Sequence, residues 1–169
     1  MLLLGICGCS GGDRNTNAAA TEEEETTFPF TAEEFRKRYN KFALQMDNKF
    51  VIKKKFNIEK GATVDVFELD FEKGISIVGT VSQQNGLLRG VMLILENENS
   101  EFLTVFLTTA YAVTDGVLKE EIDKVVLEML KEAAGTEKNI QLIRKVGSLQ
   151  YSMDANNLNG MFSIYPLSE

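Results

Sequence analysis

The sequence contains no histidine, and its two cysteines, Cys7 and Cys9, both lie within the first ten of its 169 residues. The rest of the chain therefore has no disulfide, no thiol nucleophile, no imidazole base and no Cys/His zinc site. The usual hydrolase triads are excluded with them, and we expect no metal and no cofactor. Carboxylates, lysines, tyrosines and serines remain, so an enzyme that uses carboxylates or tyrosines stays as an alternative.

Internal repeats, a Gly-rich phosphate-binding loop and an apolar run long enough to span a membrane are also missing from the sequence. The net charge of −7 argues against a nucleic-acid partner, because binding to nucleic acid needs a basic surface. The remaining composition, 44% hydrophobic and 25% charged residues, is ordinary for a globular protein. The length is that of one domain with a sizeable core.

The amino terminus contains the most specific motif. An apolar run ends in Ile6-Cys7-Gly8-Cys9, which resembles the lipobox of bacterial lipoproteins: an aliphatic residue, two small residues and the cysteine that is lipidated. The resemblance implies cleavage before Cys9 and a stable membrane anchor on Cys9, since two or more acyl chains are attached. In Gram-negative members, Ser10 after the cysteine implies delivery to the outer membrane, facing the periplasm. Only eight residues precede Cys9 and none is Lys or Arg, so we expect a truncated signal peptide.

Residues 10–27 are mostly small and polar and have no apolar periodicity, so we expect a flexible tether there. The chain then divides into a signal peptide (1–8), a tether that begins at the lipidated cysteine (9–27) and a single folded domain (28–169). The acidic run Glu22–Glu25 could form a cation site, but a solvated acidic run is the favoured interpretation.

Two helices are predicted from apolar residues at helical spacing. A capping box at Thr31 and Glu34 begins a helix over residues 32–46. A second helix is predicted over residues 118–133, with Gly135 as its stop.

The segment Glu101–Val113 fits both a strand and a helix. Its β-branched and aromatic residues favour a strand. A helical stripe, Ser100 as a possible N-cap, and a length that is large for a strand favour a helix, which is the prediction adopted.

Strands are predicted on both sides of Gly61. The lysines of Lys49–Lys60 could lie against anionic headgroups, but an edge strand whose lysines discourage edge-to-edge pairing is favoured. In Val64–Phe71 the apolar residues change phase, which predicts a bulge near Val66. We expect the carboxylates of this strand to face water: Asp65, Glu68, Asp70 and Glu72.

The C-terminal segment predicts a hairpin of Ile140–Met153 and Met161–Leu167. Its connection, Asp154–Gly160, is similar in composition to a calcium loop. The spacing does not fit, because the glycine is seventh and Tyr165 occupies the place of the twelfth-position Glu. We therefore interpret it as a hairpin loop.

We expect the rest of the domain to be organised around Ile75–Leu95, two apolar strands joined at Asn85-Gly86. Asn-Gly favours a two-residue type I′ turn, which sets a register with Val81 opposite Gly90, Val78 opposite Leu93 and Ile77 opposite Ile94. Helices should then cover one face of this hairpin, composed of Ile75, Ile77, Val81, Leu88, Met92 and Ile94. Four residues are expected to be almost fully buried: Phe35, Ile77, Ile94 and Leu130.

The same register places an apolar group with one arginine on the opposite face. Either another part of the chain covers this group, or it is an exposed surface that binds a partner. The predicted partner-binding residues are Val78, Arg89, Val91, Leu93 and Leu95.

The order of elements predicts an α+β fold: an antiparallel sheet of about five or six strands with two or three helices packed on one face. We expect a lipid-anchored protein of the cell envelope that binds an envelope or secreted protein without catalysis, as an inhibitor, an immunity-type protein or an assembly accessory. The alternative is a small-ligand-binding protein or an enzyme with a pocket between sheet and helices.

Overall fold

The computed structural model describes residues 25–71, 74–96, 101–134, 139–155 and 159–168. These residues form three helices: α1 (Ala32–Gln45), α2 (Phe102–Val113) and α3 (Lys119–Ala134). They also form seven strands: β1 (Ile58–Glu59), β2 (Asp65–Phe71), β3 (Ile75–Val81), β4 (Leu88–Glu96), β5 (Ile140–Val146), β6 (Leu149–Ala155) and β7 (Asn159–Pro166).

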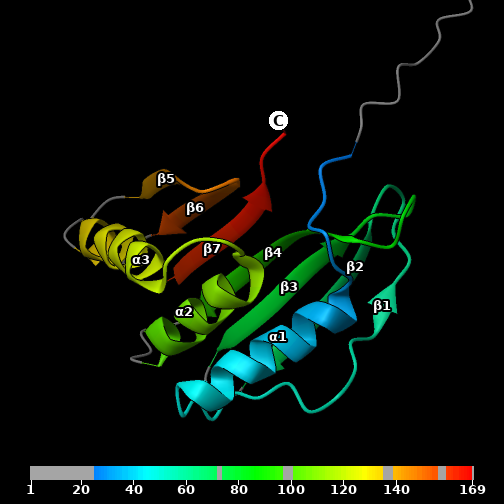
Figure 1. Ribbon diagram of the computed structural model, residues 1–169, viewed down its shortest axis with the longest axis horizontal. Coiled ribbons are helices and arrows are strands. Elements are labelled where there is room, and N and C mark those ends of the chain that lie inside the picture. The colour runs from blue at the N-terminus through cyan, green and yellow to red at the C-terminus, as the bar shows by residue number, and fades with distance from the viewer. Residues whose placement is uncertain (1–24, 72–73, 97–100, 135–138, 156–158, 169) are drawn as a thin grey trace, which may run out of the picture.

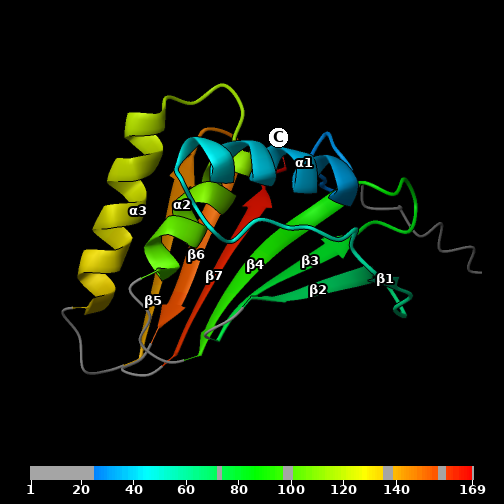
Figure 2. The same ribbon diagram turned by 90° about the horizontal axis from the view of Figure 1, so that it is seen from below.

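All seven strands join in one antiparallel sheet with the order β1-β2-β3-β4-β7-β6-β5. Two three-stranded meanders, β2–β4 and β5–β7, therefore meet where β4 pairs with β7 at the centre. The three helices lie on the same side of the sheet, α1 over β2–β4 and α3 beside β5 (Figures 1 and 2). The predicted α+β architecture with helices on one face is confirmed, with seven strands in place of five or six.

The additional strand arises at Gly147, which divides the predicted strand Ile140–Met153 into β5 and β6. Val146 pairs with Leu149, so Gly147 and Ser148 form a two-residue turn. Gly147 has a φ of 58°, in the left-handed region that a residue without a Cβ adopts at little cost. Gly-Ser is a recognised hairpin signal. The predicted C-terminal hairpin is present as β6 and β7, but its predicted first strand is divided in two, so a three-stranded meander takes the place of two strands.

The first helix, α1, begins with the predicted capping box. The Glu34 N–H donates to the Thr31 hydroxyl at 3.3 Å, and the Thr31 N–H donates to the Glu34 carboxylate at 2.8 Å. The buried side of the helix sets Phe35 against Phe67 and Tyr39 against Phe71, with ring centroids 6.4 Å and 6.2 Å apart. The prediction that Phe35 is core is confirmed.

The ambiguous segment 101–113 is helical, as predicted. Nine of the 12 residues of α2 are buried, so the apolar and β-branched composition reflects burial on several sides of a helix. The hydroxyls of Thr108 and Thr109 donate to carbonyls one turn earlier, which satisfies two buried polar groups. The residue before the helix is Glu101, whose side chain makes no capping bond; the predicted cap Ser100 lies outside the described residues.

The helix predicted over 118–133 is α3, which buries Ile122, Val126 and Met129. Leu130 is only half-buried, so its predicted place in the core was wrong, because it lies at the margin of the apolar stripe. The predicted stop Gly135 lies outside the described residues.

Residues 49–57 do not form the predicted edge strand. Pairing with β2 is confined to Ile58 and Glu59, and the preceding segment follows α1 instead. The Asn40 side-chain amide holds it there: its oxygen accepts from the Ile52 N–H at 2.7 Å, and its nitrogen donates to the Ile52 carbonyl at 2.9 Å. A side chain that satisfies both backbone groups of one residue replaces the ladder that a strand would have supplied.

The bulge predicted near Val66 is absent from β2, which pairs with β3 in regular register from Asp65 to Phe71. The change of phase arises because Asp65 lies on the helix-facing side, where it is buried. Its carboxylate accepts from Lys60 at 2.6 Å and from Gln83 at 2.9 Å. Glu68 and Asp70 are exposed as predicted, while Glu72 lies outside the described residues.

The predicted register of the central hairpin was wrong. The connection is longer than a two-residue turn: Ser82 pairs with Leu87, and Val81 lies opposite Leu88. A bulge then makes Arg89 an extra residue, so that Thr80 faces Gly90 and Ile77 faces Leu93. Relative to the predicted register, the longer connection shifts the pairing by two residues, which leaves each side chain on its predicted face. The bulge shifts the pairing by one residue, which places the side chains of β4 beyond Arg89 on the opposite face from the predicted one.

Candidate binding face

The side of the sheet away from the helices is a continuous surface formed by six strands, and no described residue outside the sheet lies across its centre (Figure 2). Cross-strand partners share a face of a sheet, so the observed register identifies which side chains lie together on it. Two rows cross it: Glu68, Val78, Met92, Ser163, Ser152 and Ile143; then Asp70, Ser76, Ile94, Met161, Asp154 and Gln141. We call this surface the open face.

The centre of the open face is apolar where the two meanders meet. Val78, Met92, Ile94, Met161 and Tyr165 are half-buried there by one another and by the neighbouring strands. Ser163, between Met92 and Ser152, is only 5% exposed. A solvated sheet face is ordinarily polar at such positions.

Tyr165 lies at one end of this apolar group, where it packs on β4. Its ring lies 2.4 Å from the position that a Cβ at Gly90 would occupy, so only glycine leaves room for the ring. Beside it the Arg89 guanidinium pairs with the Glu25 carboxylate at 2.9 Å. Arg89 and Tyr165 line a shallow hollow of about 350 Å³ together with Thr26, Val64, Thr80 and Pro166. Glu25 and Thr26, which were expected in the tether, therefore contact the domain.

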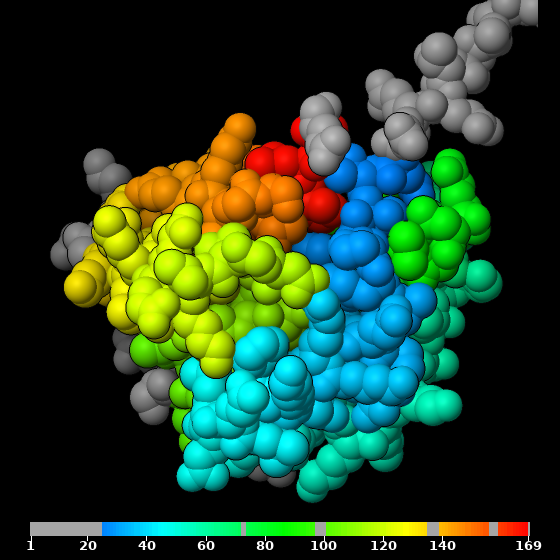
Figure 3. Space-filling model, in the orientation of Figure 1, coloured from blue at the N-terminus to red at the C-terminus, as the bar shows by residue number. Residues whose placement is uncertain are grey.

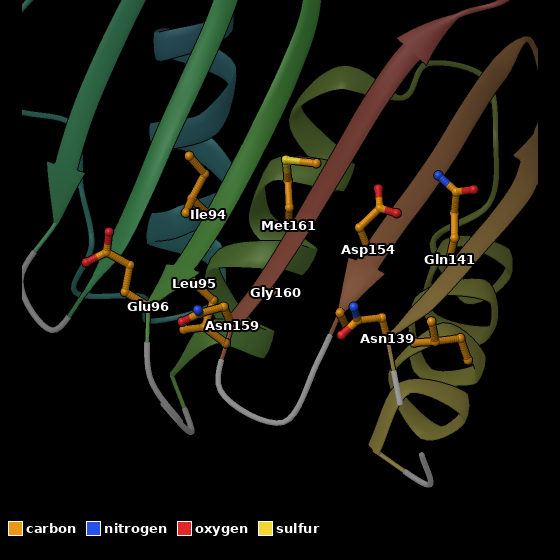
Figure 4. A pocket seen from close by; sticks show the side chains of 11 residues that line it. Ile94, Leu95, Glu96, Asn139, Gln141, Asp154, Asn159, Gly160 and Met161 are labelled. Atoms are coloured by element: carbon orange, nitrogen blue, oxygen red, sulfur yellow. The ribbon is translucent and has the colours of Figure 1, made fainter. Parts of the chain in front are cut away.

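A larger hollow, about 560 Å³, lies at the opposite end of the face (Figure 4). Its apolar lining comes from the ends of four strands: Ile94 and Leu95 of β4, Ile140 of β5, Ala155 of β6 and Met161 of β7. Its polar lining comes from Glu96, Asn139, Gln141, Asp154 and Asn159.

The charges on the open face are mainly acidic. Glu68 and Asp70 are exposed along β2, Asp154 lies on β6, and Glu96 lies at the end of β4. The basic residues are Lys145 on β5 and Arg89, whose charge is already paired with Glu25. An apolar centre with an acidic margin favours a partner that has an apolar surface with basic residues around it.

The structure separates the five predicted partner-binding residues. Val91 and Leu93 are fully buried beneath the helices, and Leu95 packs against the same core, because the bulge at Arg89 inverts this part of β4. Of the five, Val78 is on the open face and Arg89 is at its margin. Ile94, predicted as core, is instead half-buried on the open face. Cys9 lies outside the described residues.

Four apolar residues of the open face were missed: Met92, Ile94, Met161 and Tyr165. For Met92 and Ile94 the sequence offers no signal, since Val91–Leu95 is apolar at every position and an inverted phase leaves the same pattern. For Met161 and Tyr165 the signal was the alternation of β7, but the neighbouring strand had not been identified. Met92 and Ile94 lie on the same surface as Met161 and Tyr165 because β4 pairs with β7, and that pairing was not predicted.

The tyrosines of the interior are poor candidates for acid–base chemistry. Burial raises the pKa of Tyr151 to about 12, and burial also raises the pKa of Tyr39 and of Tyr111, so their hydroxyls stay protonated near neutral pH. The Tyr151 hydroxyl is 2.5 Å from the Thr114 hydroxyl, and Tyr111 donates to Asp123. These contacts are structural: they satisfy buried polar groups between helices and sheet.

Neither a metal site nor a membrane-spanning helix is present among the described residues. They contain no group of three or more acidic or sulfur ligands that could hold a metal ion. None of the three helices is long and apolar enough to cross a bilayer.

Comparisons with known proteins give no significant match to a family model, to a curated protein or to a solved structure. The open face, identified from geometry alone, is therefore the basis for the function proposed below.

Proposed function

We propose that this chain is a lipid-anchored protein of the cell envelope that binds another protein through the open face of its sheet, without catalysing a reaction. The observation that carries the proposal is the apolar centre of that face, where five large apolar side chains meet with no described element covering them. An exposed apolar patch with a polar margin is typical of a protein-binding surface.

The chemistry of the face indicates the kind of partner. Met92 and Met161 are unbranched and polarisable, so they can adapt to the shape of an opposing surface. Tyr165 adds a large ring with a polar tip, a residue type enriched at interfaces. The acidic margin favours a partner with basic residues around its own apolar patch, because opposite charges speed encounter and disfavour partners of the wrong sign.

Anchoring at the membrane is proposed from the lipobox-like motif Ile6–Cys9. Two or more acyl chains on Cys9 would hold the protein stably at a bilayer, and the residues up to Glu25 would connect the domain to the anchor. If the cell is Gram-negative, Ser10 favours the outer membrane, with the domain in the periplasm.

The acids and apolar groups of the hollow in Figure 4 favour a second candidate function, the binding of a small amphipathic cation in that hollow.

The test compares Met92→Lys with Leu127→Lys, the same substitution on the outer surface of α3, where Leu127 is 38% exposed. Each chain, made with a complete signal sequence, is used to capture partners from envelope extract. The protein retained by the wild-type chain is then purified, and its affinity for each variant is measured. We expect Met92→Lys to abolish binding and Leu127→Lys to retain it, with unchanged circular dichroism in both. Equal affinity of the two variants would refute the open face as the binding surface.

The small-cation candidate is tested with the same purified chains. Asp154→Asn removes one acid of the hollow and should weaken the binding of an amphipathic amine, measured by calorimetry, without affecting protein capture. If Asp154→Asn binds the amine as well as wild type does, the hollow is not a ligand site.

A further inference from the structure

Positive charge is concentrated in one part of this acidic chain. Residues 36–60 contain nine basic and two acidic residues, a formal charge of +7 in a protein whose net charge is −7. These residues belong to α1, to the segment that follows it and to β1. They lie on the helix-bearing side of the molecule and at its β1 margin (Figures 1 and 2).

Two hydrogen-bonded contacts hold the lysines of this segment beside those of α1. Asn40 binds both backbone groups of Ile52, and the Arg36 guanidinium also donates to the Ile52 carbonyl at 3.2 Å. Lys53, Lys54 and Lys55 follow immediately, so their backbone is held beside α1, and Lys53 and Lys54 line a hollow between this segment and β2. The space-filling view shows α1 and the adjoining segment as one continuous surface (Figure 3).

Five lysines on this surface are exposed and form no ion pair within the described residues: Lys37, Lys41, Lys53, Lys54 and Lys55. Other basic residues nearby do have acidic partners, as in Arg36–Glu33, Arg38–Asp115 and Lys60–Asp65. Leu44, which is 75% exposed, lies on the same side of α1 as Lys37 and Lys41. We call these five lysines and Leu44 the basic face.

The structure removes the explanation that the sequence favoured for Lys53–Lys55. Lysines on an edge strand discourage pairing with another sheet, but residues 49–57 are not a strand. That explanation therefore does not apply to the lysines of the basic face.

We propose that the basic face binds the anionic headgroups of a lipid bilayer. Lysines near an anionic surface contribute additively to attraction, and a protruding leucine can insert between lipid headgroups. An extended chain from Cys9 to Glu25 spans at most about 55 Å, enough for this face to reach the bilayer that holds the anchor. The open face then points away from the membrane, toward its partner.

This inference relies on the proposed anchor only for bringing a bilayer within reach, and its test uses a chain that cannot be lipidated. The full chain with Cys9→Ser is mixed with vesicles of phosphatidylcholine, with or without phosphatidylglycerol, and bound protein is measured by sedimentation. The comparison variant is Lys53→Gln, Lys54→Gln, Lys55→Gln. Its matched control is Lys124→Gln, Lys131→Gln, Lys145→Gln, three exposed lysines elsewhere on the domain. Circular dichroism verifies that both fold.

We expect binding only to the anionic vesicles, weakened by added salt and reduced on the order of a hundredfold in the comparison variant. The control should retain most of its binding, and Leu44→Gln should weaken binding with no change of charge. Equal binding to neutral vesicles, or an equal loss in the control, would overturn the proposal. So would binding to duplex DNA or polyglutamate but not to vesicles. None of these outcomes depends on Met92. Failure of the basic-face proposal would therefore not refute partner binding by the open face, which is tested separately with Met92→Lys.

Discussion

Two tyrosines buried to the same degree differ in how their hydroxyls are satisfied. The Tyr151 hydroxyl is hydrogen-bonded to Thr114 at 2.5 Å. The Tyr39 hydroxyl lies near Asn48 but has no hydrogen bond of good geometry to a described group. The unsatisfied group lowers the stability that the Tyr39 ring otherwise contributes to the core, because a buried hydroxyl without a partner is costly.

Substitution of each tyrosine by phenylalanine should therefore affect the free energy of unfolding differently. Tyr39→Phe is expected to leave the free energy of unfolding within about 0.5 kcal/mol of wild type or to raise it, since no bond is lost. Tyr151→Phe should lower it by about 1 kcal/mol, since one buried hydrogen bond is lost. Urea unfolding followed by circular dichroism measures both, and a loss of more than about 1 kcal/mol in Tyr39→Phe would show that its hydroxyl is paired.

The bulge at Arg89 gives two adjacent residues opposite environments. Leu93 is fully buried under the helices, whereas Ile94 is half-buried on the open face. Leu93→Ala should cost about 2–5 kcal/mol of unfolding free energy. Ile94→Ala should cost less than about 1.5 kcal/mol, because less of its area leaves water on folding. Chemical denaturation of the two variants tests the register directly, and the reverse order of the two losses would restore the face assignment that the Asn-Gly turn predicted.

At the scale of elements, Asp65 links three parts of the β1–β4 half of the sheet. Its carboxylate, on β2, accepts from Lys60 and from Gln83, in the β3–β4 connection. These two bonds hold the pKa of Asp65 below its usual value. A group whose pKa is lower in the folded state stabilises the fold above its unfolded pKa of about 3.9, and that stability is lost as the pH falls through the folded pKa.

The expected result is a pH-dependent difference between wild type and Asp65→Asn. The variant should be less stable at pH 7, and the difference should shrink below about pH 4, where the wild-type carboxylate also becomes neutral. Thermal unfolding at a series of pH values between 7 and 3 measures it. Glu68→Gln, on the same strand but exposed, is the control for the removal of a carboxylate from β2.

Elements with strong local signals were predictable, and the pairing between them was less so. The capping box at Thr31 and the stripe of α3 are local, and both were found. The positions of the sheet elements depended on features that local patterns do not reveal: the bulge at Arg89, the burial of Asp65 through Lys60 and Gln83, and the Asn40 contact that keeps residues 49–57 out of the sheet. Each of these is a side-chain or backbone interaction between residues that only the folded chain brings together.

The same distinction applies to the candidate site. The sequence indicated an apolar surface opposite the helices, and the structure contains one, but four of its five central residues differ from those predicted. Val78 lies on the face on which it was predicted, because β3 alternates cleanly between faces. The residues of β4 were inverted, since a run that is apolar at every position cannot reveal its own phase.

For the whole molecule, the proposed anchor makes a direct prediction. Cys9→Ser, expressed in a bacterial host from a completed signal sequence, should move the protein from the membrane fraction to the soluble fraction. A stable anchor needs the acyl chains, and the basic face alone would give only salt-sensitive, reversible attachment. Fractionation at low and at high salt, with immunoblotting, distinguishes the two contributions. A variant that still enters the detergent phase at high salt would contradict lipidation at Cys9.

The strand order of the sheet also determines the course by which the chain can fold. Within each meander, every pairing joins strands that are neighbours in sequence, so the two meanders can form by local steps. The pairing of β4 with β7 is different, because residues 97–158 lie between the paired segments and the entropy of closing that long loop must be overcome. We expect this pairing to form late. Met92 and Ile94 come from one meander and Met161 and Tyr165 from the other, so we expect the apolar centre of the open face to form only with this late pairing, and a partner of the proposed kind would then recognise only the fully folded protein.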